Sequence, residues 1–128
     1  METRDEQIGR VVAVVDDDAS VRRSVSNLLQ SLGLHVESFA SAEEFLHSAD
    51  RTNTGCLVLD LWMPGMKGSD LLVHLADSGQ LIPTVIVTGH GDDKAHEQTM
   101  RAGAVAFLRK PFRSDALIDA VRSVMAHI

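Results

Sequence analysis

Short apolar runs alternate with longer amphipathic segments along this chain. Several of the runs are almost uninterrupted Val, Leu and Ile, a pattern typical of strands that are buried on both faces of a parallel sheet. The runs predict five strands: Val11–Val15, His35–Phe39, Cys56–Leu59, Thr84–Val87 and Ala104–Leu108. Because such strands expose neither face to water, we expect helices on both sides of the sheet.

The segments between the runs predict these helices. Apolar residues recur at helical spacing from Ser20 to Leu32, and Gly33 follows where a left-handed C-terminal cap is expected. Ser41 and Glu44 form a capping box that opens a second helix. Three further helices are expected over 70–78, ending at Gly79, over 93–102, ending at Gly103, and from a Ser114 N-cap nearly to the C-terminus.

Five strands that alternate with five helices indicate an α/β fold. Parallel strands joined by right-handed crossovers form an open, doubly wound sheet, and 128 residues suffice for one domain with a single core. Ligands of such sheets bind at the carboxyl ends of the strands. The search for function therefore begins at the strand ends.

Polar side chains stand at the ends of four of the predicted strands. Asp16, Asp17 and Asp18 follow the first strand, Asp60 the third, Thr88 the fourth and Lys110 the fifth. Carboxylates that converge in a partly buried cleft raise one another's pKa unless a hard cation neutralises them. Mg²⁺ prefers carboxylate and carbonyl oxygens and often binds phosphate as well, so the pattern indicates Mg²⁺-assisted phosphoryl chemistry. Lys110 would supply charge to a phosphoryl group, and Thr88 a hydroxyl donor.

Two of these acids also have simpler explanations. Acids after a strand are common as helix N-caps, and we expect Asp18 to act mainly in that way. Asp60 precedes the loop PGMKG, so taken singly it is equally well explained as a turn residue. The joint placement of acids, a hydroxyl and a lysine at four strand ends nevertheless favours a shared site.

Composition excludes several other classes of function. A formal net charge of −6 disfavours direct binding to nucleic acid or to anionic membranes. No apolar run reaches the ~18 residues that a membrane span requires. The single cysteine, Cys56, is expected to be a small buried strand residue of a cytoplasmic protein, and the six histidines show no helical pair that would suit a transition metal.

Four motifs resemble the receiver domains of two-component response regulators. They are VVDDD, LVLDLWMPGMKG, PTVIVTGHG and GAVAFLRKPF, and the resemblance extends from about Arg10 to the end of the chain. It is strongest to the FixJ-type branch, whose full-length members usually add a C-terminal helix-turn-helix domain that binds DNA. We therefore expect either a single-domain regulator or a receiver separated from such a domain.

The resemblance also implies the topology and the domain limits. The sheet would be flavodoxin-like or CheY-like, with strand order 2-1-3-4-5. A receiver domain would occupy residues 10–128 and a flexible segment residues 1–9.

By motif position, the resemblance implies a role for each residue of the site. Asp60 would be the phosphoacceptor. The Mg²⁺ ion would be bound by Asp17, Asp60 and the backbone carbonyl of Trp62, with Asp16 holding a metal-bound water, while Thr88 and Lys110 would bind the phosphoryl group. Phosphoryl transfer requires alignment and charge neutralisation more than covalent assistance, and such a set of residues supplies both.

The resemblance further implies a switch. Phosphorylation adds roughly −1.5 to −2 charge, which would draw Thr88 inward together with Phe107. The alternative for Phe107 is a plain core aromatic. The face of the fourth helix, fifth strand and fifth helix would then change and form a partner or homodimer surface. The phosphodonor would be a histidine kinase or a phosphotransfer protein.

Three other positions carry expectations from the same resemblance. Trp62 and His90 would border the path of the attacking water and influence the lifetime of the acyl phosphate. An exposed loop aromatic or a partner contact is an equally good interpretation of Trp62. The peptide bond before Pro111 is expected to be cis, although base rates alone favour the trans form.

Two other functions compete with the signalling switch. A Mg²⁺-dependent phosphohydrolase also forms an aspartyl phosphate on a doubly wound sheet, but it places its nucleophile in a DxDx[TV] motif that DDDAS does not match. A flavodoxin-like binder of nucleotides or flavins would need a glycine-rich phosphate loop after the first strand. Neither explains Asp60, Thr88 and Lys110 together, so the sequence favours a switch over an enzyme.

Overall fold

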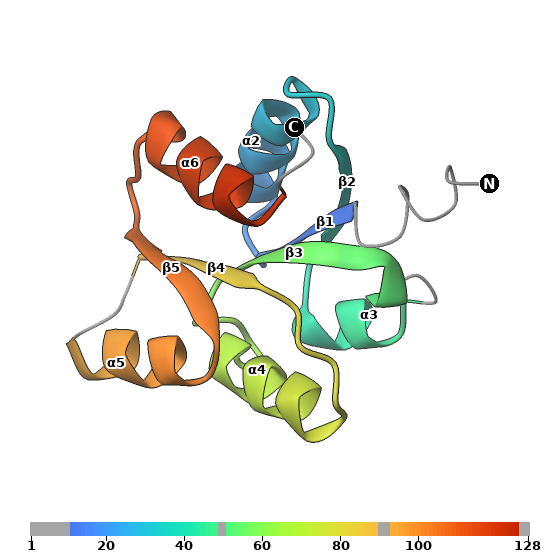
Figure 1. The fold of residues 1–128 in the computed structure, drawn as a ribbon, viewed down its shortest axis with the longest axis vertical. Coiled ribbons are helices and arrows are strands. Elements are labelled where there is room, and N and C mark those ends of the chain that lie inside the picture. Colours follow the sequence, from blue (N-terminus) through green and yellow to red (C-terminus); the bar gives the residue numbers. More distant parts are fainter. Residues whose placement is uncertain (1–10, 49–50, 90–92, 126–128) are drawn as a thin grey trace.

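The computed structural model describes residues 11–48, 51–89 and 93–125. Five parallel strands form one sheet with the order β2-β1-β3-β4-β5 (Figure 1). They are β1 (Val11–Val15), β2 (His35–Phe39), β3 (Thr54–Leu59), β4 (Thr84–Thr88) and β5 (Ala104–Arg109). The predicted α/β class and strand order are confirmed. The segment over residues 1–9 that was expected to be flexible lies outside the described residues.

Three strands are longer than their apolar runs. Thr54 pairs with Val11, so β3 begins before the run does. Thr88 pairs with Arg109, which extends β4 and β5 by one residue each. Backbone pairing therefore continues into polar residues, which hydropathy alone does not mark as strand.

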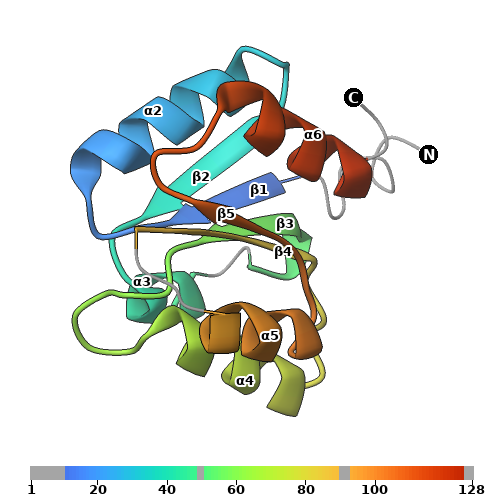
Figure 2. The ribbon, with the colours of Figure 1, turned by 90° about the vertical axis from the view of Figure 1, so that its left-hand side faces the viewer.

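Helices cover both faces of the sheet, as Figures 1 and 2 show. On one face lie α2 (Ala19–Gln30) and α6 (Ser114–Val124), and on the other lie α3 (Ala42–Leu46), α4 (Gly68–Asp77) and α5 (Asp93–Arg101). A short 3₁₀ helix, η1 (Arg51–Asn53), leads into β3. The described helices include none that combines the length and the apolar character needed to cross a membrane.

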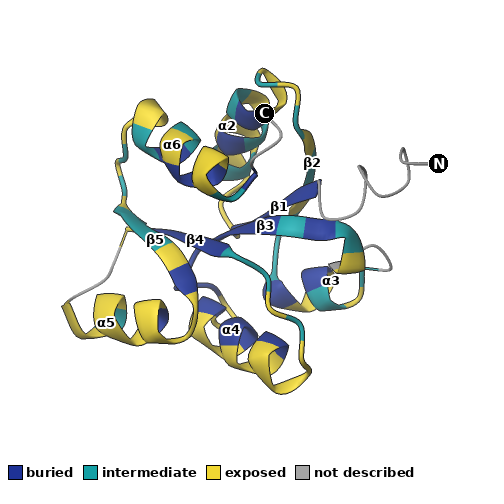
Figure 3. Ribbon diagram, viewed as in Figure 1, coloured by how far each residue is buried: buried dark blue, intermediate teal, exposed yellow. Residues whose placement is uncertain are grey.

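The core is divided into two layers by the central strands, which are buried along most of their length in Figure 3. Successive side chains of a strand point to opposite faces. Val12 and Val14 of β1 accordingly pack with residues of α2 and α6, while Ala13 and Val15 pack with residues of α3 and α4. Burial on both sides fixes β1 in the middle of the molecule and thereby fixes the position of the acids that follow it.

Helix α2 begins as the sequence predicts. The Oδ1 atom of Asp18 accepts the N–H groups of Ser20 at 2.9 Å and Val21 at 3.3 Å. The predicted N-cap role of Asp18 is therefore confirmed. At the other end, Gly33 has a φ of 85°, the left-handed conformation expected after the helix.

The starts of the other helices agree less well. Ser41 Oγ accepts the N–H of Glu44 at 3.1 Å, but the Glu44 carboxylate accepts from Ala40, one residue before the partner that a capping box uses. Helix α4 begins two residues earlier than predicted, with Lys67 as its N-cap. The predicted N-cap role of Ser114 is wrong: Arg113 is the extended cap residue, and Ser114 is already helical.

Replacing Asp18 by Ala should lower the free energy of unfolding by about 1 kcal/mol, because the first N–H groups of α2 lose their acceptor. Asp18→Asn removes the same charge but keeps an acceptor, so its stability should stay close to that of the wild type. Urea unfolding followed by circular dichroism measures both. An equal loss in the two variants would mean that the charge of Asp18, rather than its cap bonds, stabilises the helix.

Candidate functional site

The residues that follow the strands are held side by side by backbone hydrogen bonds that continue the sheet. The Asp60 N–H donates to the Val15 carbonyl at 3.0 Å, which brings Asp60 next to Asp16. The Lys110 N–H donates to the Thr88 carbonyl at 2.8 Å. The topology therefore gathers the predicted polar residues at the carboxyl edge of the sheet, although they are far apart in the sequence.

Three carboxylates converge at this edge. One oxygen from each of Asp16, Asp17 and Asp60 lies within 4.8 Å of the others. Asp16 and Asp60 are only 3% and 6% exposed, whereas Asp17 is exposed to solvent. The donor set consists of oxygens alone and opens to water on one side, which suits a hard cation that keeps part of its hydration shell.

Lys110 brings a positive charge to the same pocket. Its Nζ atom lies 2.9 Å from Asp16 Oδ2 and 3.7 Å from Asp60 Oδ2. Burial lowers the pKa of Lys110, but the hydrogen bond to Asp16 and the charges of the surrounding carboxylates outweigh it, so the pKa is raised overall. The ammonium therefore stays charged and neutralises part of the acidic pocket.

The surroundings stabilise the charged form of Asp60 less well than that of Lys110. Burial and the negative charge of Asp16 raise its pKa, and these effects exceed the lowering by Lys110, by the Trp62 N–H and by the Thr88 side chain. The Trp62 N–H donates to Asp60 Oδ1 at 3.3 Å. A further positive charge in the pocket would favour the ionised form of Asp60, which is the form required of a nucleophile.

Asp16 has both carboxylate oxygens engaged within the protein. Oδ1 accepts the N–H of Asp18 at 2.9 Å, and Oδ2 accepts Lys110 Nζ at 2.9 Å. These bonds fix the carboxylate at the base of the pocket. Asp16 therefore has less freedom than the exposed Asp17 to turn toward a bound ion.

The loop after Asp60 is closed tightly on itself. The Gly68 N–H donates to the Leu61 carbonyl at 3.0 Å. A Cβ atom at Gly68 would lie 2.3 Å from the Asp60 carbonyl oxygen and 2.9 Å from Leu61 Cα. No side chain fits there without a shift of the Asp60 backbone, so Gly68 helps to set the position of the candidate phosphoacceptor.

A second contact ties the same loop to α3. The Met66 N–H donates to Glu43 Oε2 at 3.0 Å, and this bond lowers the pKa of Glu43. At the other side of the loop, Lys67 Nζ lies 5.0 Å from the centre of the Trp62 ring, a cation–π distance. Trp62 is 48% exposed, so its ring lies at the surface of the loop.

Phe107 occupies a half-buried position on β5 rather than the centre of the core. The centre of its ring lies 4.9 Å from that of His96 on α5, and the guanidinium carbon of Arg109 lies 5.3 Å from the ring centre. The ring thus contacts two polar side chains and also packs against the edge of the core on the side of α3 and α4. The inward movement expected of Phe107 stays a prediction.

The remaining predicted positions are less central to the pocket. The Lys110–Pro111 peptide bond is cis. Cys56 is buried as expected, and burial raises the pKa of its thiol to about 12, so the thiol stays protonated and unreactive. His90 lies outside the described residues.

Three residues near the pocket were not predicted from the sequence: Arg22, Glu43 and Lys67. Arg22 lies on α2, and its Nη1 atom donates to the Asp16 carbonyl at 2.7 Å. A cation in the first turns of the helix after the acids was the available signal for Arg22. The bond between Glu43 and Met66 spans 23 residues and leaves no local pattern.

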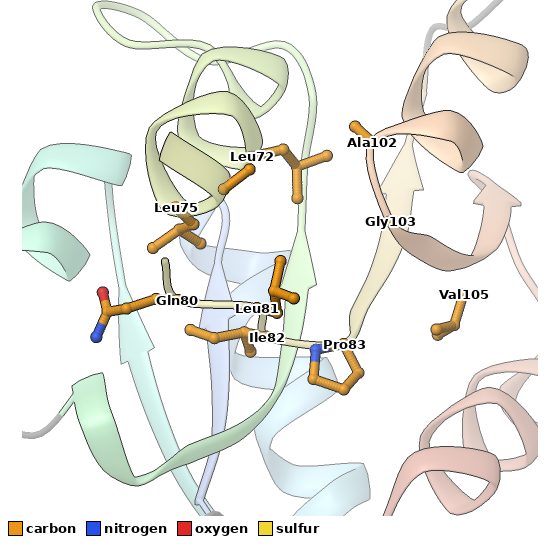
Figure 4. A pocket seen from close by; sticks show the side chains of 10 residues that line it. Leu72, Leu75, Gln80, Leu81, Ile82, Pro83, Ala102, Gly103 and Val105 are labelled. Carbon is orange, nitrogen blue, oxygen red and sulfur yellow. The ribbon is translucent and has the colours of Figure 1, made fainter. Parts of the chain in front are cut away.

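Hollows lie on the surface of the described part of the chain, and two of them bear on the search for a site. One, of about 500 Å³, adjoins Lys110 between α2 and residues 110–112. The other, of about 280 Å³, lies near the amino ends of β4 and β5, away from the acids (Figure 4). Leucine, isoleucine and valine side chains dominate this second hollow, and no charged residue lines it, so it offers no site for phosphate or a metal.

A family model for the response regulator receiver domain matches residues 12–122. The chain belongs to this family. Receiver domains are phosphoacceptor switches of two-component systems rather than enzymes that act on a separate substrate, and an acidic triad of this kind is typical of their Mg²⁺ site. The alternatives of a phosphohydrolase and of a flavin or nucleotide binder are thereby set aside.

Individual relatives support the same conclusion. Nodulation protein W of Bradyrhizobium diazoefficiens is 49% identical over 111 residues, which cover 87% of this chain and 49% of that protein. The crystal structure of FixJ-N has a TM-score of 0.82 and 41% identity, and covers 92% of this chain and 94% of that one. The chemotaxis protein CheY4 of Vibrio cholerae has a TM-score of 0.80 and 28% identity over 89% of this receiver and 97% of that chain, in agreement with a CheY-like fold. The chain spans about half the length of the curated relatives it matches.

Gly68→Ala should lower the free energy of unfolding by about 2 kcal/mol, because the added Cβ collides with the Asp60 carbonyl. Gly89→Ala is the matched control, since a Cβ there meets nothing within 4 Å. Urea unfolding of the two variants gives the comparison. Equal stabilities would show that the loop moves aside at little cost and does not fix Asp60.

Asp60→Asn should stabilise the metal-free receiver at neutral pH and raise its Tm by a few degrees. The folded pKa of Asp60 is raised, so ionisation of the buried carboxylate opposes folding as the pH rises through that pKa. Well below the ordinary Asp pKa of about 3.9, where the acid is protonated in both states, the difference should disappear. Thermal unfolding in EDTA from acid to neutral pH measures the difference in Tm between the wild type and Asp60→Asn. The variant Asp119→Asn, which changes an exposed acid, is the control. A less stable Asp60→Asn at pH 7 would mean that attraction to Lys110 outweighs burial.

Proposed function

We propose that Asp60 of this receiver accepts a phosphoryl group from a histidine kinase or a phosphotransfer protein, with Mg²⁺ as cofactor. The observation that carries this proposal is the burial of the Asp60 carboxylate beside two other carboxylates and the ammonium of Lys110. A cleft with these groups can neutralise a phosphoryl group while it is transferred.

Asp60 would act as the nucleophile of the transfer. One of its carboxylate oxygens forms a bond to phosphorus as the bond between phosphorus and the donor histidine nitrogen breaks, which leaves an acyl phosphate and a free imidazole. Oδ1 is oriented by the Trp62 N–H, and Oδ2 lies 3.7 Å from Lys110 Nζ. That distance is longer than a hydrogen bond, so the ammonium lies close to Asp60 without blocking its oxygen.

The acidic pocket would hold Mg²⁺ through Asp17, Asp60 and the Trp62 carbonyl, with Asp16 acting through a water. The bonds of Asp16 to Lys110 and to the Asp18 N–H support its indirect role, because both of its oxygens already have partners. When bound, the ion supplies positive charge to the phosphoryl oxygens.

Thr88 and Phe107 would carry the signal away from Asp60. Thr88 is buried at the end of β4, and its side chain hydrogen-bonds Asp60, so it is placed to exchange that partner for a phosphoryl oxygen. Phe107 lies on the neighbouring strand and packs against His96 of α5. A movement of both residues would alter the surface of α5, β5 and α6.

That surface would act on a partner or form a phosphorylation-dependent homodimer. A DNA-binding output domain of the FixJ type, or a separate protein, would receive the signal. We place the receiver domain at residues 10–128 and expect no direct contact of this domain with DNA. The roles of Trp62 and His90 in the lifetime of the acyl phosphate, and the cytoplasmic location, stay predictions.

Incubation with labelled acetyl phosphate and Mg²⁺ tests the proposal. The wild type should gain one acid-stable, base-labile label, and Asp60→Asn should fall to the background, because it lacks the nucleophile. The control Asp119→Asn, an exposed acid of α6, should label like the wild type. Absence of label in the wild type, or equal labelling of Asp60→Asn, would contradict the assignment.

A further inference from the structure

Arg22 makes a contact with the acidic pocket that none of the roles above explains. It lies on α2 and is half-buried, and its Nη1 atom donates to the backbone carbonyl of Asp16 at 2.7 Å. The next residue, Arg23, is exposed to solvent. Among the described residues, no carboxylate lies within 4.0 Å of the Arg22 side chain as an ion-pair partner. The guanidinium is therefore directed at the backbone of the pocket rather than at a charged partner.

The carbonyl that Arg22 binds belongs to the peptide unit between Asp16 and Asp17. A peptide unit is planar, so holding the Asp16 carbonyl also fixes the orientation of the Asp17 N–H and the direction in which Asp17 leaves the strand. The other side of Asp16 is fixed by its N–H bond to the Phe39 carbonyl at 3.2 Å. Together these bonds hold the turn between β1 and α2 from both ends.

Asp17 depends on such support more than its neighbours do. Asp16 is anchored through both carboxylate oxygens and Asp60 is buried, but Asp17 is exposed and has no surrounding core to orient it. Its carboxylate nevertheless lies within 4.8 Å of the other two. The backbone from which it projects is thus the main element that directs it toward the pocket.

We infer that Arg22 is a positioning residue for the metal ligands: its bond to the Asp16 carbonyl holds the Asp16–Asp17 peptide so that the Asp17 carboxylate faces Asp60. This inference rests on the proposed function of the pocket as a Mg²⁺ site. A guanidinium suits the task because it stays charged at all relevant pH values and its donors have a fixed, planar arrangement.

If Arg22 acted through its charge alone, its removal would change the Mg²⁺ affinity in the opposite direction from the loss of a positioning contact. A positive group near the pocket repels a bound cation, so removing the charge of Arg22 would tighten Mg²⁺ binding if electrostatic repulsion were its main contribution. Loss of a positioning contact instead weakens binding, because Asp17 must then be ordered when the ion arrives. The direction of the change therefore separates the two explanations.

Mg²⁺ titration of Arg22→Met, Arg22→Lys and Arg23→Met provides the test. Trp62 is the only tryptophan of the chain and its N–H binds Asp60, so its fluorescence is a direct probe, with the amide chemical shifts of residues 16–18 as a second one. Arg22→Met should raise the Kd for Mg²⁺ about tenfold. Arg23→Met, which removes the same charge one residue away, should leave it unchanged. Arg22→Lys keeps the charge and a donor and should restore part of the affinity.

Urea unfolding of the metal-free variants separates positioning from stability. If Arg22 only stabilised the fold, Arg22→Met would lower the unfolding midpoint without changing the Kd of the folded protein for Mg²⁺. An unchanged or lower Kd for Mg²⁺ in Arg22→Met would therefore overturn the inference. If Arg22→Met does not fold, the Kd of Arg22→Lys for Mg²⁺ is used instead, and a value no higher than that of the wild type would overturn the inference. A wild type that neither binds Mg²⁺ nor is labelled at Asp60 would refute the proposed function too. A wild type that does both, beside an unaffected Arg22→Met, would refute only the role of Arg22.

Discussion

The balance of charge between Lys110 and the buried acids is the interaction on which the rest of the pocket depends. The ammonium forms a 2.9 Å bond with Asp16 and stands 3.7 Å from Asp60. Burial raises the pKa of Asp60, the nearby charge of Asp16 raises it further, and the single cation Lys110 offsets these two effects only in part. The pocket of the folded protein therefore holds less positive charge than negative charge, which favours binding of a divalent cation.

The fold keeps this unbalanced pocket in place by burying its supports. Asp16 and Asp60 follow two adjacent central strands, β1 and β3, whose side chains are packed on both faces. The backbone bond from the Asp60 N–H to the Val15 carbonyl joins the two strand ends directly. Burial of aliphatic residues thus stabilises the strands strongly enough to hold carboxylates at their ends that repel each other.

The apolar pattern predicted the strands and the residues at their ends, because buried parallel strands require nearly continuous apolar runs. The order of the strands in the sheet was implied by the resemblance to receiver domains. The same pattern could not show which side chains bind backbone groups. Backbone carbonyl and N–H groups are nearly the same in every residue, so the types of Asp16 and Met66 do not mark them as the partners of Arg22 and Glu43. The error at Ser114 has a related cause: Arg113 takes the cap position although its side chain, which binds Asp115, accepts no bond from the helix N–H groups.

The contact between Asp16 and Lys110 joins residues 94 positions apart, at the first and last strands in the chain. During synthesis, a chain that has been made only as far as β4 contains the acids and the hydroxyl but lacks the cation that partly neutralises them. The pocket is completed only when β5 joins the sheet at the far edge. Assembly of the proposed phosphoryl site is thereby linked to completion of the domain, because a truncated or partly folded receiver lacks the cation that the proposed transfer uses.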